Sequence, residues 1–89
     1  MKRWVSDNNL YQLMFELAYD EECILKFTVD KDDETCYWYY STLLQVEHDC
    51  IFADNIEEAK EEFEYMIRTH FEDEISYWEM TLDNWDKED

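Results

Sequence analysis

The spacing of apolar side chains predicts a helix in the last third of the chain. Between residues 55 and 89 they recur at steps of three and four, the period of one face of an α-helix. This stripe contains Ile56, Ala59, Phe63, Met66, Ile67, Phe71, Ile75, Trp78, Leu82 and Trp85. The run Asp54-Asn55-Ile56-Glu57 is a variant of a capping box and predicts that the helix begins at about residue 55.

Two alternatives stay open within this region. A second capping pattern, Thr69-His70-Phe71-Glu72, predicts a break into helices over 55–68 and 70–86. The apolar stripe keeps its phase across the break, so one long helix fits as well. The alternation of Trp78, Met80 and Leu82 also fits a strand over 75–82, although a helix is favoured.

The middle of the chain alternates with the period of β-strands. Residues 23–29 alternate, with Cys23, Leu25, Phe27 and Val29 on one face. Two further strands are expected at 35–44 and 46–52. An Asx-rich turn at 30–34 precedes the first of these. The turn signal near Leu44 and Gln45 is weaker, so the last two strands could also form one bent strand.

The N-terminal segment reads as a helix over about 7–20, capped by Ser6, with Leu10, Leu13, Met14 and Leu17 on one face. The whole pattern predicts a single α+β domain over residues 1–89. A three-stranded antiparallel sheet would pack with this N-terminal helix and with one long or two short C-terminal helices. The expected core is Leu13, Leu17, Leu25, Phe27, Val29, Trp38, Leu43, Ile51, Phe63, Ile67, Phe71 and Ile75.

The chain has a large excess of acidic residues. Seven Lys and Arg against 25 Asp and Glu give a net charge of −18, well beyond the roughly 2–8 that keeps a small domain soluble. Such an excess destabilises a compact state by self-repulsion, so we expect it to serve a function. Nucleic acid and anionic membranes would be repelled as direct partners. The implied partner is a cationic protein surface, and strongly cationic clefts most often bind nucleic acid.

Composition also excludes several kinds of enzyme. The chain has no Gly and no Pro, so it holds no Gly-rich phosphate loop, dinucleotide fingerprint or G-x-S-x-G elbow. Three Cys without a C-x-x-C pair, and no recognisable signal peptide after Met1, predict free thiols in the cytosol. No apolar run is long enough to span a bilayer.

The acidic side chains form a candidate binding row. A second helical row, expected on the face opposite the apolar stripe, contains Glu57, Glu61, Glu64, Glu72, Glu79, Asp83 and Asp86. Only Arg68 interrupts its sign. Side chains three and four apart lie roughly 4.5–6 Å apart along a helix axis, which compares with ~3.4 Å between phosphates on one DNA strand. The row therefore predicts partial mimicry of a phosphate backbone. Additional acidic contacts are expected at Asp20, Glu21, Glu22, Asp32 and Asp33.

Sixteen aromatic residues exceed what so small a domain buries. In the run from Tyr37 to Tyr40, alternation places aromatics on both faces of the sheet. Trp38 is assigned to the core. Tyr37 and Tyr39 are assigned to the outer face, where they would anchor a partner or a second copy of the chain.

Metal binding and catalysis find little support. The Asp30-x-Asp32 run begins like a calcium loop, but the sixth and twelfth loop positions are Thr35 and Ser41 instead of Gly and Glu. His48, Cys50 and His70 match no zinc spacing. We therefore expect no cofactor, no metal and no enzymatic activity.

In size, charge and low Gly content the chain resembles the small inhibitors that phages direct against bacterial defences, namely anti-CRISPR proteins and DNA-mimicking anti-restriction proteins. That resemblance implies a cytoplasmic inhibitor in the basic nucleic-acid-binding cleft of a CRISPR effector, restriction enzyme or nuclease. The chain also resembles acidic immunity proteins and antitoxins that neutralise a cognate nuclease. A small metal-binding or structural phage protein is a further alternative.

Overall fold

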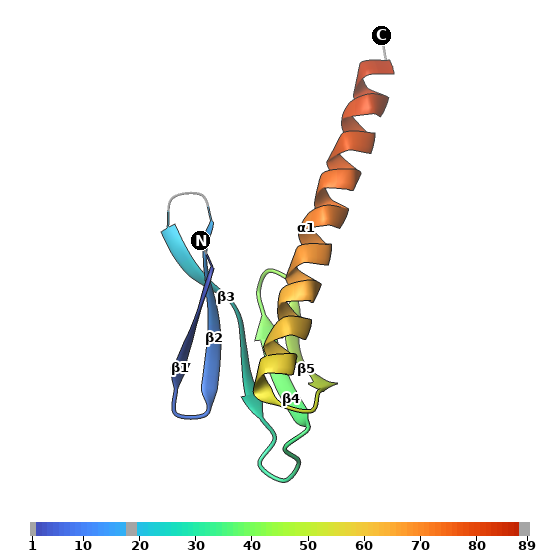
Figure 1. Cartoon of the computed structure of the whole chain (residues 1–89). Helices are drawn as coiled ribbons and strands as arrows, with labels where there is room; N and C mark the ends of the chain where they lie inside the picture. Colours follow the sequence, from blue (N-terminus) through green and yellow to red (C-terminus); the bar gives the residue numbers. More distant parts are fainter. Residues whose placement is uncertain (1, 18–19, 88–89) are drawn as a thin grey trace.

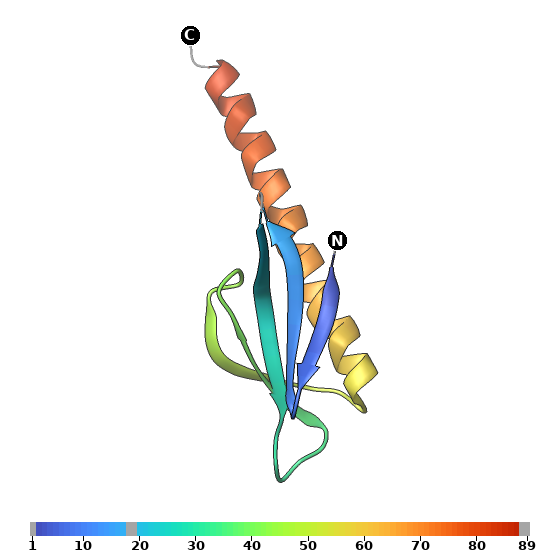
Figure 2. The same cartoon turned by 90° about the vertical axis from the view of Figure 1, so that its left-hand side faces the viewer.

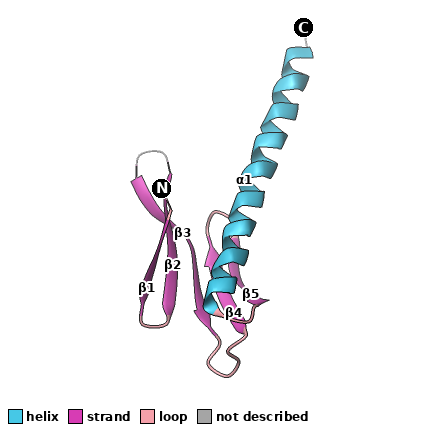
Figure 3. Ribbon diagram, in the orientation of Figure 1, coloured by secondary structure: helices cyan, strands magenta, loops and turns pink. Residues whose placement is uncertain are grey.

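The computed structural model describes residues 2–17 and 20–87 and confirms the α+β class. Five strands form one antiparallel sheet in the order β1-β2-β3-β4-β5, and a single helix follows (Figures 1 and 3). The elements are β1 (Arg3–Asp7), β2 (Leu10–Leu17), β3 (Asp20–Val29), β4 (Cys36–Ser41), β5 (Val46–Phe52) and α1 (Ile56–Lys87).

The predicted N-terminal helix over 7–20 is wrong, because residues 7–17 contain the end of β1, a turn and β2; residues 18 and 19 lie outside the described residues. The register of the β1–β2 hairpin pairs Trp4 with Leu13 and Asp7 with Leu10. The tight turn between the strands contains Asn8, whose φ of 57° lies in the left-handed region that Asn tolerates better than most residues. Because β2 lies between β1 and β3, its backbone forms hydrogen bonds on both sides. This pairing outweighs the local helical spacing of its leucines.

The three predicted strands correspond to β3, β4 and β5, although β3 begins earlier and β4 ends at Ser41. In the turn before β4, Asp30 Oδ2 accepts a hydrogen bond from the backbone N–H of Asp32 at 3.0 Å. The turn expected near Leu44 and Gln45 is also present, with Gln45 at a φ of 60°. Strands β4 and β5 are therefore separate strands and not one bent strand.

α1 is continuous over 32 residues, so both the break near Thr69 and the strand over 75–82 are wrong. The helix begins where the capping pattern in the sequence predicts. Asn55 caps it, because the Asn55 side-chain oxygen accepts a hydrogen bond from the Glu58 backbone N–H at 2.9 Å. The apolar stripe thus runs along one helix, and it meets the sheet only over the first half of that helix.

The core lies between one face of the sheet and the first half of α1. Ala59, Phe63 and Ile67 are buried there against the sheet. Of the predicted core, Leu13, Leu25, Phe27, Phe63 and Ile67 are buried, and Leu17, Val29, Leu43, Ile51 and Phe71 pack partly buried against them. Two assignments are wrong: Ile75 is 58% exposed, and Trp38 lies on the sheet face away from this core.

The prediction that Tyr37 and Tyr39 face outward is also wrong. They are only 1% and 6% exposed. The register pairs Tyr39 with Phe27, which places both on the face that α1 covers, and the rings of Tyr39 and Phe63 lie 5.0 Å apart. These tyrosines therefore offer no surface to a partner. Trp38 instead stacks on His48 on the other face, at 4.5 Å between ring centroids.

The second half of α1 projects beyond the sheet (Figures 1 and 2). Every residue from 72 to 87 is exposed. The Cα radius of gyration is 16.1 Å, whereas a compact chain of this length would give about 12 Å. We call residues 72–87 the projecting half. No described helix is long and apolar enough to cross a membrane.

Candidate protein-binding surface

The projecting half concentrates negative charge. It holds six carboxylates, and Lys87 at its end is its sole Lys or Arg. The acids are Glu72, Asp73, Glu74, Glu79, Asp83 and Asp86. Lys87 pairs with Asp83 at 2.9 Å, with both side chains well exposed. Because the pair is exposed, it adds little to stability, and the segment keeps a net charge of −5 from six acids and one base.

The same segment exposes an apolar stripe. From Phe71 onward, the stripe residues are spaced four, three, four and three apart. We call Phe71, Ile75, Trp78, Leu82 and Trp85 the distal stripe. The last four are 58–74% exposed, whereas soluble monomers seldom leave large apolar side chains together in water. Contiguous apolar side chains with a charged border indicate an interaction surface.

Part of the predicted acidic row, namely Glu64, Glu72, Glu79 and Asp86, lies beside the apolar stripe, whereas Glu61 lies opposite the buried Ala59 and Phe63. At about 100° of rotation per residue, Glu72, Glu79 and Asp86 fall on one flank of the distal stripe. Nearer the sheet, Glu64 and Glu72 share the lining of a groove with core residues such as Leu13. A row of side chains spaced three and four residues apart gradually changes its direction around the helix. The sequence period alone therefore does not show whether such a row lies beside the apolar stripe or on the opposite face.

Glu64 is committed to contacts within the molecule. The ammonium of Lys2 donates a hydrogen bond to Glu64 Oε1, and the indole N–H of Trp4 donates to Glu64 Oε2 at 2.8 Å. Partial burial raises the pKa of this carboxyl, but the hydrogen bonds from Lys2 and Trp4 outweigh burial and leave the pKa below its ordinary value. Of the predicted row, Glu64 is therefore the least available to a partner.

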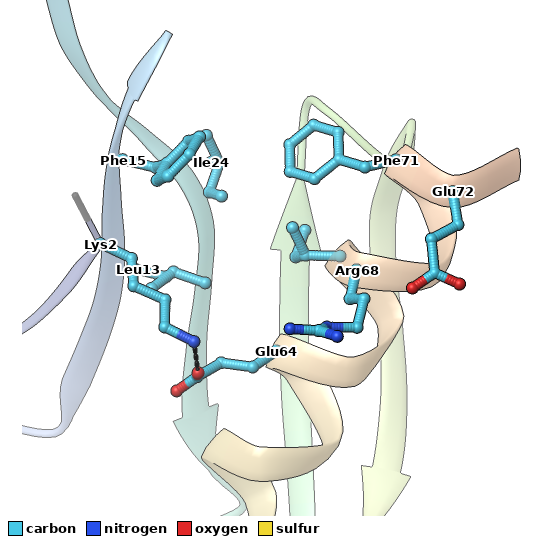
Figure 4. Close-up of a pocket in the computed structure, with 9 residues that line it drawn as sticks. Lys2, Leu13, Phe15, Ile24, Glu64, Arg68, Phe71 and Glu72 are labelled. Carbon is cyan, nitrogen blue, oxygen red and sulfur yellow. Dashed lines mark hydrogen bonds and ion pairs between the residues drawn. The ribbon is translucent and has the colours of Figure 1, made fainter. Parts of the chain in front are cut away.

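A groove of about 310 Å³ separates the first half of α1 from the β2–β3 hairpin (Figure 4). Phe15 of β2 and Phe71 of α1 face each other across it, with ring centroids 6.1 Å apart. A second hollow continues outward from this pair along the distal stripe to Leu82. We call this second hollow, which is lined by Phe15, Phe71, Ile75, Trp78 and Leu82, the distal groove.

The other predicted acids lie at opposite ends of β3. Asp20, Glu21 and Glu22 are exposed at the end of the sheet from which α1 projects (Figure 1). The carboxylate of Glu21 accepts two hydrogen bonds from Arg3, at 2.6 and 2.9 Å, and these lower its pKa.

Asp32 and Asp33 lie in the loop at the other end of β3, so they do not join the surface formed by the projecting half. There the hydroxyl of Thr35 donates a hydrogen bond to Asp33 at 2.6 Å and lowers the pKa of Asp33.

The thiols and imidazoles of the described residues lie in different surroundings. Burial, and next the neighbouring Cys50, raise the pKa of the Cys36 thiol, which favours the unreactive protonated form. The His48 ring stacks on Trp38. Within residues 2–17 and 20–87, no three His, Cys, Asp or Glu side chains are grouped so as to hold a metal ion.

Comparison of the chain with models of protein families, with curated proteins and with solved structures finds no match. The arrangement of charge and apolar surface on the projecting half is the basis on which a function is proposed.

Proposed function

We propose that the protein is a non-enzymatic inhibitor that occupies the basic nucleic-acid-binding surface of another protein. The partner class that we propose is a bacterial defence effector, such as a CRISPR effector or a restriction enzyme. One observation carries the proposal: α1 extends beyond its own fold, and its residues 72–87 present six carboxylates against a single Lys or Arg, Lys87.

Electrostatics supports this choice of partner. Self-repulsion among these acids costs stability, and a surface rich in Arg and Lys relieves it on binding. Glu72 and Asp86 are separated by about 21 Å along the axis at 1.5 Å per residue. That length compares with about six phosphate steps on one DNA strand. A projecting rod of negative charge is therefore suited to a groove that otherwise holds a nucleic-acid backbone.

The same features support a second candidate, an immunity protein or antitoxin that neutralises one cognate nuclease. Both candidates place the projecting half in a basic cleft. They differ in the protein that is neutralised, so one set of variants tests both.

The experiment expresses the protein in bacteria that carry a CRISPR or a restriction system and measures plating of a targeted phage. The test variant combines Glu79→Lys, Asp83→Lys and Asp86→Lys. The control variant combines Asp7→Lys, Glu34→Lys and Glu47→Lys, three exposed acids outside α1. The two variants change net charge equally. We expect the wild type and the control to restore plating and the test variant to fail.

Equal activity of the two variants would contradict a role for the projecting half. Failure of the wild type against both classes of defence system would contradict the proposed inhibitor. Rescue of cells from a co-expressed nuclease toxin would then favour the immunity alternative. Displacement of labelled DNA from the purified effector provides the matching measurement in solution.

A further inference from the structure

Beyond Phe71, which packs partly against the core, the distal stripe is exposed, and charge alone does not explain it. We infer that the distal groove binds an amphipathic helix of the partner, one whose apolar stripe is bordered by Lys or Arg. This inference rests on the proposed function in one respect, namely that the partner is a basic protein. The nature of the bound element comes from the geometry of α1.

The spacing of the distal stripe is that of a helix that packs against another helix. In the seven-residue repeat of paired helices, apolar residues occupy the positions called a and d, three and four residues apart. Ile75 and Leu82 fall at a, and Phe71, Trp78 and Trp85 fall at d. The covered half has the same spacing, because Ile56, Ala59, Phe63 and Met66 are three, four and three apart and pack against the sheet. The stripe therefore continues at the same spacing past the point at which α1 leaves the sheet, and from Ile75 onward its side chains are exposed.

The bordering positions select the charge of the partner helix. Position e, on one border of the stripe, is acidic three times, at Glu72, Glu79 and Asp86, and position g on the other border contains Glu74. Residues at e and g contact the facing helix and determine which helices pair. Acids at these positions match Lys or Arg on the opposing helix. The long aliphatic stems of those side chains would also cover the edges of the apolar stripe.

The same borders oppose pairing with a second copy of this chain. In a parallel pair, Glu74 of one copy would face Glu79 of the other across the g–e contact. In an antiparallel pair, the acidic e border would face its own copy. Each arrangement places like charges together, which is destabilising. The anionic flanks also disfavour an acidic lipid surface. A basic helix is the occupant that satisfies both the apolar stripe and its borders.

The distal groove also determines the length of the bound helix and the position of one of its ends. Phe71 and Trp85 are separated by about 21 Å along the axis, or about four helical turns. At the sheet end, Phe15 of β2 faces Phe71 and extends the apolar lining onto the hairpin (Figure 4). A partner helix of about four turns would therefore lie along the projecting half, with one end against Phe15.

The test uses a designed peptide of about four turns with Leu at a and d and Lys at e and g. A peptide of the same composition in scrambled order reports attraction by charge alone. A third peptide carries Glu at e and g. Binding to the full-length protein is measured by calorimetry and by the fluorescence of the chain's tryptophans, using peptides that contain none. We expect saturable one-to-one binding of the first peptide, at least about tenfold tighter than either of the other two.

Matched variants locate the binding site. Ile75→Ser with Leu82→Ser alters the distal stripe, whereas Tyr77→Ser with Met80→Ser alters other faces of the same helical turns. The four side chains are similarly exposed, at 58–68%, so the two variants should fold equally well. We expect roughly tenfold or greater loss of peptide affinity for the first pair and little change for the second.

Three outcomes would overturn the inference: equal binding of the ordered and scrambled peptides, equal effects of the two variant pairs, or self-association of the protein that Ile75→Ser with Leu82→Ser abolishes. The last outcome would assign the groove to a second copy. The proposed function fails by a different result, the insensitivity of inhibition to the acid-to-Lys changes. An inhibitor that retains full activity with Ile75→Ser and Leu82→Ser would contradict the helix-binding inference alone.

Discussion

Trp4 on the edge strand β1 donates its indole N–H to the carboxylate of Glu64 on α1, at 2.8 Å. The ring of Trp4 also packs edge-on against Phe27, with centroids 5.5 Å apart. One side chain thus joins the first strand, the centre of the core and the helix. This contact explains why the N-terminal hairpin stays against α1, although residues 60 positions apart in sequence have to meet.

Glu64→Ala should destabilise the protein by about 1–3 kcal/mol, because it removes the acceptor for Lys2 and leaves the partly buried Trp4 N–H without a partner. The measurement is urea unfolding followed by tryptophan fluorescence. Glu61→Ala changes an exposed carboxylate one turn away and should shift stability by less than about 0.5 kcal/mol. Similar losses in the two variants would contradict the structural role of Glu64.

The pH dependence of stability should also report on Glu64. Its folded-state pKa lies below the ordinary value of 4.5, so the unfolded state binds the proton more readily. The stabilisation is therefore fully present above pH 4.5 and is lost as pH falls through the folded-state pKa. The difference in unfolding free energy between wild type and Glu64→Gln should shrink over that acidic range. A difference that stays constant with pH would contradict this linkage. Comparing the two proteins cancels most of the general self-repulsion that also changes with pH.

Gln45→Gly should stabilise the protein by about 0.5–1 kcal/mol, because Gln45 holds a φ of 60° where a residue with a Cβ is strained. Thermal unfolding measures the gain. Asn8→Gly is the comparison, since Asn8 has a similar φ of 57° but Asn tolerates that region better. We expect a smaller gain there, and a loss of stability in Gln45→Gly would contradict the prediction.

Phe63→Ala and Trp85→Ala should differ sharply, although both remove an aromatic ring from the same stripe of α1. Phe63 is fully buried, so its loss should cost about 3–5 kcal/mol. Trp85 is 74% exposed, and its loss should change stability by less than about 0.5 kcal/mol. Chemical denaturation measures both. Comparable losses would mean that the projecting half packs against the domain in solution.

The sequence predicted the middle strands and the start of α1 because their signals are local. Strand alternation is clear in residues 23–29, and Asn55 caps the helix within a few residues of the predicted start. The N-terminal segment carries two periods at once. Leu10, Leu13 and Leu17 fit a helix, whereas Tyr11, Leu13 and Phe15 alternate as in a strand. Pairing with β3 decides between these periods, and that contact is not visible in the local sequence.

The assignment of faces failed for a related reason. In β4 both faces are aromatic, so alternation separates Tyr37 and Tyr39 from Trp38 without showing which side meets the helix. In α1 the period identifies an apolar face but does not show how far the sheet covers it. The spacing of threes and fours continues along the whole helix, so it does not show where the covered part ends.

Because residues 72–87 are exposed along their whole length, the part of α1 that we assign to recognition is separate from the part that holds the domain together. Substitutions there escape the constraint of close packing, which restricts change at positions such as Phe63. Such a protein is free to acquire a new target by altering its outer helical turns, while the sheet and the inner turns remain as they are.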